Sequence, residues 1–269
     1  MNNKSGMRRL SFLYGIGRDA IISIACVLFA ILLWFITTSL GWIKPLFLPS
    51  PQEIAFTFWD LAYEGYRQVP LHIHTLVSLA RALVAFFVSV VIGIPLGLLM
   101  GFFPALNAAI DPFVEFFRPL PKLALIPLVV LWFGIGEVAK FVLIFTATVL
   151  TIIVSAAAAV RGVPESRIRI ARALELTQYQ FFRHVIFPSV LPDLFTGVRV
   201  GVGIGWTTLI AAEMIAATSG VGWMVLNASA YLRTDIVLLG IVILGVTGYI
   251  LDIAIVIIQD RVVPWMGKG

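Results

Sequence analysis

Two ionisable side chains inside one apolar stretch are the residues of this sequence best placed to do chemistry away from water. Arg199 and Glu213 both lie in the run of residues 188–214. An arginine near the middle of a membrane span costs at least about 2.5 kcal/mol, so such groups are expected to face other helices or water. Each therefore has two interpretations, a structural ion pair or a residue of a translocation path. For Glu213 we favour a gate near the outer mouth, with a local pair to Arg233 as the alternative.

Other motifs for catalysis or cofactor binding are missing from the sequence. It has no GxxxxGK[ST] loop for ATP, no HExxH zinc motif and no GxSxG nucleophile motif. His72 and His74 are two residues apart with no third ligand nearby, so no metal site is expected. Cys26 is the single cysteine, which excludes an intrachain disulfide. The sequence predicts neither an enzyme nor a chain that binds ATP itself.

The composition is that of an integral membrane protein. Hydrophobic residues make up 60% and charged residues 12% of the 269 residues, whereas soluble domains have about 45–50% and about 25%. The net charge of +5 comes from residues near the ends of apolar runs and not from a basic domain. Nucleic acid is therefore not an expected partner.

Six apolar runs predict an all-α protein with six transmembrane helices. The third run is short and interrupted at Pro127, and short broken helices in transporters commonly line the path. Residues 43–75 predict an outer loop with one interfacial helix, because aromatic side chains favour the membrane surface. Residues 104–122, with four prolines, are expected at the inner face, and residues 215–235 are expected to dip into the outer face as part of a gate. The predicted spans are residues 20–42, 76–103, 123–133, 141–160, 188–214 and 236–259.

The basic residues set the orientation of these spans. Arginine and lysine concentrate in the segments that six spans place inside the cell, which is the positive-inside pattern. Both termini and the loop of residues 161–188 are therefore predicted to be cytoplasmic, and Arg118 and Lys122 belong to the same inner group. We divide the chain into a cytoplasmic segment (residues 1–19), one transmembrane domain (residues 20–260) and a cytoplasmic tail (residues 261–269).

Glycines recur at a spacing of four in two of the spans. Such ridges let another helix approach closely, so we expect each ridge to pack against a helix. The ridge of the second span is Gly93, Gly97 and Gly101, and that of the fifth is Gly197, Gly201 and Gly205.

The polar loop of residues 161–188 has the pattern of two short helices joined by a hinge. Pro164 suits the first turn of a helix whose apolar residues recur at helical spacing up to Leu174. Thr177 and Gln180 have the spacing of a capping box, which predicts that a second helix begins there. Arginines occupy the other face. Such a basic loop is either a docking element for a cytoplasmic partner or an interfacial helix on anionic membrane lipid.

The segment ARALELTQYQFFRHVIFPSVLPDLFTGVRVGVGIGW resembles the EAA-loop region of permeases from binding-protein-dependent ABC importers. When the two are aligned on Pro188, the Glu-Ala-Ala of the family falls on Arg169, Ile170 and Ala171, and its glycine falls on Glu175. The likeness extends through PLFLPSPQE, FFRPLPKLALIPLVVLWFGIGEVAKFVLI and GIGWTTLIAAEM. These segments look like the nitrate, sulfonate and taurine branch of the family, and the taurine permeases look most similar.

This resemblance implies the type I ABC importer fold in a bacterial inner membrane. Two copies of the permease would form the path, and two cytoplasmic ATPase subunits would dock on their loops. A periplasmic or lipoprotein binding protein would deliver the substrate from outside. ATP and magnesium would be bound by the ATPase subunits and not by this chain. The two glycine ridges are candidates for the contact between the copies.

The resemblance also implies roles within the loop. The residues implied in coupling to the ATPase are Arg169, Ala171, Arg172, Leu174, Glu175, Thr177 and Pro188. Ala171 and Leu174 would seat in a groove of the ATPase, with the charged residues at its rim. Thr177 would act as an N-cap in place of the lost glycine. A rigid two-helix element would then carry ATPase closure to the membrane helices.

For the path, the resemblance points to a small sulfonate such as taurine. A permanent anion needs small residues and a few polar donors along the wall, and Trp206, Thr207 and Thr208 are the candidates. Helix packing is the alternative interpretation of these three residues. Nitrate, bicarbonate or another small organic anion is the alternative cargo. An ATP-independent secondary transporter would need a relay of buried carboxylates, for which only Glu213 and Asp252 lie within predicted spans.

Overall fold

The computed structural model describes residues 4–265, with side chains from residue 21 onward, and its regular elements in that range are all helical. This confirms the prediction of an all-α protein. The elements in chain order are α1 (Lys4–Ser39), α2 (Pro51–Tyr63), α3 (Leu71–Phe102), α4 (Pro104–Phe117), the 3-10 turn η1 (Lys122–Leu125), α5 (Ile126–Phe133), α6 (Glu137–Arg161), α7 (Glu165–Ala173), α8 (Gln178–Phe181), the π-helical turn η2 (Phe182–Ile186), α9 (Phe187–Ala216), α10 (Val221–Ala230) and α11 (Thr234–Val262).

Five or six segments of the described chain can cross a membrane, and the predicted number of six is reached only if one bent pair of helices is a single span. Five are long and apolar enough alone, and the sixth is a pair of helices, Pro104–Phe117 and Lys122–Phe133, bent by 87°. Residues 104–117, which were predicted as a segment at the inner face, form a helix, and they meet the length and hydropathy criteria for a span only together with residues 122–133. Pro119 and Pro121 lack the N–H that a continuous helix needs, so the bend falls there.

The helix α6 is packed between α3 and α9, and both glycine ridges face it. A Cβ on Gly97 would lie 2.6 Å from the Cβ of Ala156, and one on Gly93 would lie 3.0 Å from a methyl of Ile152. Gly201 of α9 approaches the same Ile152 side chain, at 3.1 Å. The ridges therefore make contacts within their own chain, which removes them as candidates for the contact between two copies.

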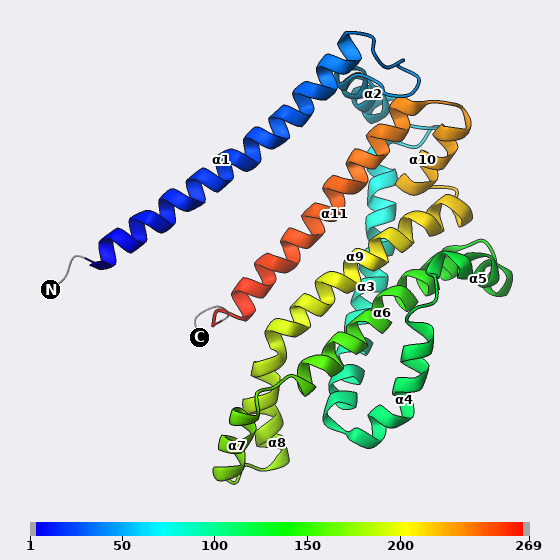
Figure 1. Cartoon of the computed structure of the whole chain (residues 1–269). Helices are drawn as coiled ribbons and strands as arrows, with labels where there is room; N and C mark the ends of the chain where they lie inside the picture. The colour runs from blue at the N-terminus through cyan, green and yellow to red at the C-terminus, as the bar shows by residue number, and fades with distance from the viewer. Residues whose placement is uncertain (1–3, 266–269) are drawn as a thin grey trace.

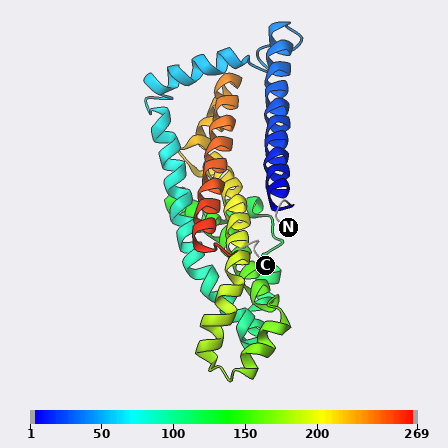
Figure 2. The same cartoon turned by 90° about the vertical axis from the view of Figure 1, so that its left-hand side faces the viewer.

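The first helix stands apart from the bundle along most of its length (Figure 1 and Figure 2). No residue from Ile21 to Ser39 is buried, and large apolar side chains are exposed along it. Near its C-terminal end the indole Nε1 of Trp34 donates to the Pro49 carbonyl at 3.1 Å. Helical backbone with an apolar exterior is what hydrocarbon requires, so α1 suits a lipid-facing position.

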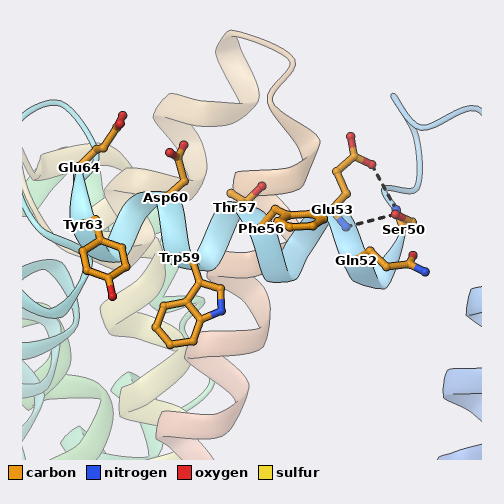
Figure 3. Close-up of a pocket in the computed structure, with 9 residues that line it drawn as sticks. All are labelled: Ser50, Gln52, Glu53, Phe56, Thr57, Trp59, Asp60, Tyr63 and Glu64. Carbon is orange, nitrogen blue, oxygen red and sulfur yellow. Dashed lines mark hydrogen bonds between the residues drawn. The ribbon is translucent and has the colours of Figure 1, made fainter.

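Two shorter helices lie at the end of the molecule opposite α7 and α8 (Figure 1). The first, α2, begins with a capping box at Ser50 and packs on α11, where Thr57 donates to Asp235 at 3.0 Å. Figure 3 shows aromatic and acidic side chains together along α2, including Trp59 and Asp60. The second, α10, has 10 residues and is too short to span a membrane.

Candidate functional site

The polar loop forms two helices with a left-handed residue at the hinge. The first, α7, begins at Glu165, so Pro164 precedes the helix instead of lying in its first turn. Glu175 then has a φ of +51°, in the left-handed region that favours glycine. This is the position at which the EAA-loop pattern has glycine. The turn of the backbone is therefore kept although the glycine is replaced.

Thr177 caps the second helix as predicted. Its hydroxyl accepts from the Gln180 N–H at 3.4 Å, and the Gln180 side chain accepts from the Thr177 N–H at 3.0 Å. From there α8 continues through η2 directly into α9, and Pro188 is half-buried in the first turn of α9. Because no loop separates α8 from α9, a displacement of α8 would also move α9.

The exposed apolar face of α7 differs from the predicted one. Ala171 is only 3% exposed, which contradicts the expectation that it seats in a partner's groove, because the chain itself covers it. Ile170 and Leu174 are 61% and 66% exposed and lie four residues apart on one face. Sequence reasoning missed Ile170 because it assigned the apolar face to residues three apart, such as Ala171 and Leu174. The charged residues expected at the rim are all exposed: Arg169, Arg172 and Glu175.

Glu213, the predicted gate residue, is the centre of a buried polar cluster at the end of the bundle where α10 lies. Its side chain is 0% exposed. The carboxylate accepts from Arg81 Nη1 at 2.7 Å, from the Ser78 hydroxyl at 2.8 Å and from the Gly222 N–H at 3.0 Å. The alternative pair with Arg233 does not form, since Arg233 pairs with a carboxylate two residues along the chain at 2.7 Å.

Arg81 ties four segments together through this cluster. Its Nε and Nη2 each donate to a carboxylate oxygen of Glu137 at 2.7 Å, and its Nη1 also donates to the Ser219 carbonyl at 2.7 Å. Arg81 lies in α3, Glu137 in α6, Glu213 in α9 and Ser219 in the loop before α10. Sequence reasoning missed this partner of Glu213. The usable signal was that Arg81, like Glu213, is a charged residue inside an apolar run, and that the two charges are opposite.

The loop before α10 is wrapped closely around the Glu213 carboxylate. Gly220 has a φ of +117°, and a Cβ there would lie 2.6 Å from Glu213 Oε2. The Gly220 N–H donates to His74 Nδ1 at 3.1 Å, and the His74 ring stacks on Trp223 at 5.7 Å. His74 is therefore a packing residue at this end of the bundle. Within the described residues, no group of three His, Cys, Asp or Glu side chains could hold a metal ion.

The remaining candidates on α9 separate into two kinds. Arg199 donates through Nε and Nη2 to the carboxylate of Asp252 in α11, at 2.8 Å each, and the two side chains are 40% and 42% exposed. Trp206 and Thr208 are buried, where the indole donates to a carbonyl of α11 and the hydroxyl to a carbonyl of its own helix. We assign these two to helix packing. Thr207 is exposed.

A mixed polar stripe follows the exposed side of α9. Its members recur every three or four residues and are Thr196, Arg199, Val200, Gly203, Ile204 and Thr207. No neighbouring atom lies within 4 Å of the position that a Cβ on Gly203 would take. Hydroxyls and a charge on a membrane helix suit water or another protein surface better than lipid. The stripe is therefore a candidate wall of a path.

Comparison with known families identifies the chain. Residues 93–266 match the family described as the binding-protein-dependent transport system inner membrane component. The chain belongs to this permease family. It is the membrane permease component of an ABC importer and is not itself the ATPase. A permease of such a system works with an ATPase and a substrate-binding protein.

Similar permeases are known from several bacteria. The chain is 39% identical to the taurine transport system permease protein TauC of Escherichia coli (strain K12), over 100% of this chain and 98% of TauC. It is 31% identical to the putative aliphatic sulfonates transport permease protein SsuC of Bacillus subtilis (strain 168), over 98% and 92%. The nitrate import permease protein NrtB of Synechocystis sp. is 29% identical over 81% of each chain.

The fold of this permease is also found among solved structures. A chain from the inward-facing MetNI methionine ABC transporter aligns with a TM-score of 0.55 and 24% identity. The alignment covers 70% of this permease and 91% of that chain. The arrangement of helices is thus shared with a permease of known structure, which agrees with the expected importer fold.

Proposed function

We propose that this permease imports taurine or a closely related small sulfonate. The observation that carries the proposal is the 39% identity to TauC over the whole chain. Two aliphatic sulfonate permeases at 31% and 34% identity support the same class of cargo. Nitrate is the second candidate, favoured by the likeness to NrtB. Bicarbonate or another small organic anion would use the same architecture.

In the assembly that we propose, two copies of the permease form a type I importer and face each other across the path. The polar stripe of α9 lines that path, so Arg199 and Thr207 lie on its wall. Two ATPase subunits dock on the two loops, with Ile170 and Leu174 in the contact and the exposed charges of α7 around it. The continuity of α8, η2 and α9 then converts ATPase closure into a movement of the stripe.

The same assembly implies an orientation in the bacterial inner membrane. With α7 in the cytoplasm, α2 and α10 lie at the outer side, where a periplasmic or lipoprotein binding protein delivers the cargo. The N-terminal end of α1 and the C-terminal end of α11 both lie far from α2 (Figure 1). We therefore place the segment of residues 1–19 and the tail of residues 261–269 in the cytoplasm, on either side of one transmembrane domain.

We further propose that the Glu213 cluster acts as the outer gate. It joins α3, α6 and α9 to the loop before α10, so opening the outer end requires these contacts to separate. An ATP-independent carrier is disfavoured by the same geometry. Its two candidate relay carboxylates, Glu213 and Asp252, are each paired with an arginine.

A competition assay tests the cargo. Cells that express the permease with its own ATPase and binding protein are given labelled taurine together with excess unlabelled ethanesulfonate, nitrate or bicarbonate. We expect ethanesulfonate to suppress taurine uptake and nitrate and bicarbonate to leave it unchanged. Suppression by nitrate alone, or no taurine uptake, would contradict the proposed cargo.

A further inference from the structure

We propose that the bend of the third span binds the anionic group of the cargo, in a pocket formed by Arg118, Lys122, Thr151 and Ser155. The identity of that group as a sulfonate rests on the proposed function. The pocket is a cavity of about 410 Å³ between the bend, α6 and α9. Its volume is near the lower end of the range of about 300–1,000 Å³ for small-molecule sites, as a small cargo requires.

We place the pocket at membrane depth and not at the inner surface, because its walls lie near the middle of two candidate spans. The helix α4 connects the turn after α3 to the pocket. It has 14 residues and is therefore about 21 Å long, at about 1.5 Å per residue. Arg118 follows directly. The opposite walls come from Thr151 of α6 and Val200 of α9, both near the middle of their helices. In this proposal Arg118 and Lys122 lie within the membrane, in place of the inner group of basic residues to which their charge assigned them.

Two cations at this depth need an anion or water beside them, because an unpaired charge in a membrane is costly. In the part of the chain that the structure describes, Arg118 is paired only with Glu115, at 3.7 Å, and both side chains are more than half exposed, so that pair is weak. Lys122 Nζ donates to the Phe117 carbonyl at 2.6 Å. An ammonium has three N–H groups, so two remain for a ligand.

The other lining groups complete a site for a sulfonate on a short carbon stem. Among the described residues, no group hydrogen-bonds the Ser155 hydroxyl, which is therefore free to donate, whereas Thr151 donates to the Ala147 carbonyl at 3.1 Å. A sulfonate presents three acceptor oxygens, and the pocket offers a guanidinium, an ammonium and a hydroxyl as donors. The apolar part of the lining suits the methylene groups and consists of Leu120, Ala147, Leu150, Val154, Val200 and Ile204.

The pocket opens onto the proposed path. Val200 and Ile204 belong both to its lining and to the exposed stripe of α9. An anion that leaves the pocket therefore meets the stripe directly. Because α9 continues from the coupling loop, movement of that loop changes the wall of the pocket, which gives the bound anion a route to release.

Thiol labelling tests the anion preference without relying on transport. In a Cys26→Ser background, Ser155→Cys places a thiol in the pocket, and Thr151→Cys is a second position if the first disturbs assembly. Thr207→Cys is the matched control, on the same stripe but outside the pocket. The assembled complex is treated with 2-sulfonatoethyl methanethiosulfonate or with its trimethylammonioethyl counterpart, and each rate is normalised to a free thiol in solution.

We expect the normalised anion-to-cation rate ratio at Ser155→Cys to exceed that at Thr207→Cys by about tenfold, as electrostatic focusing predicts. The double change Arg118→Gln/Lys122→Gln should bring the ratio down to the control value, and millimolar taurine should slow the anionic reagent. Equal ratios at both thiols, a ratio unaffected by the double change, or no reaction in the pocket would each overturn the proposal.

Uptake separates failure of the site from failure of the proposed function. The double change should lower labelled taurine uptake about tenfold, in proportion to the lost focusing, and leave co-purification of the ATPase unchanged. Unchanged uptake would overturn the site and leave the cargo standing. If the unmodified complex imports no taurine, the proposed cargo is contradicted, while the labelling ratio still decides whether the pocket prefers anions.

Discussion

Replacing Arg81 by methionine should destabilise the outer end of this permease more than the loss of any exposed ion pair. The change leaves the Glu213 carboxylate, 0% exposed, without its cation. Removing one partner of a buried pair costs about 3–5 kcal/mol. Hydrogen bonds from Ser78 and Gly222 to the carboxylate remain, and each contributes about 1 kcal/mol net. We therefore expect a cost at the lower end of this range, about 3 kcal/mol.

Two substitutions of exposed partners serve as matched controls. Glu137→Gln removes the other carboxylate bound to Arg81, but that side chain is 65% exposed, so the cost should be about 0–1 kcal/mol. Arg199→Met breaks a bidentate ion pair with Asp252 at an exposed position, and its cost should also be about 0–1 kcal/mol. Adding Glu213→Gln to Arg81→Met removes the uncompensated charge and should recover part of the loss, so the two effects should not add.

Thermal unfolding of the detergent-purified permease, followed by tryptophan fluorescence, measures these differences. For chains of this size about 1 kcal/mol shifts the Tm by roughly 2–4 °C, so Arg81→Met should lower it by roughly 6–12 °C. The reasoning is refuted if Arg81→Met and Glu137→Gln lower the Tm equally, or if the double variant is less stable than Arg81→Met alone.

Three further changes test the helix packing and the coupling loop. Gly97→Ala should cost about 1–3 kcal/mol by overpacking against α6, whereas Gly203→Ala, with open space around it, should leave the Tm unchanged. Glu175→Gly should relieve about 1–2 kcal/mol of left-handed strain, and slower hydrogen exchange of the loop amides would show it, while faster exchange would contradict the hinge. Leu174→Asp should abolish co-purification of the ATPase, and Gln178→Asp, also exposed, should not. Normal recovery of the ATPase with Leu174→Asp would exclude this face of α7 from the contact.

Features with a local cause could be predicted from the sequence. The helical character and the five long spans follow from runs of apolar residues, because a span must satisfy its backbone within itself. The capping box at Thr177 depends on two residues three positions apart. The glycine ridges also predicted close helix packing correctly, since the spacing of four alone defines one face of a helix.

Features set by contacts between distant segments could not be predicted in this way. The partner of Glu213 is Arg81, 132 residues away, and no local pattern distinguishes it from the nearer Arg233. Ala171 has helical spacing like its neighbours, but only the packing of the loop decides that it is covered while Ile170 is exposed. The depth of Lys122 depends on the direction in which α4 returns, so charge counting placed it at the inner face.

ATP-dependent uptake is the most direct test of the central claim, that this chain is the permease of an importer driven by a separate ATPase. The purified permease, its ATPase and its loaded binding protein are reconstituted in liposomes, and labelled taurine uptake is measured with and without ATP on the ATPase side. We predict uptake only when ATP and the binding protein are both present. Equal uptake without ATP, from permease alone, would contradict the account.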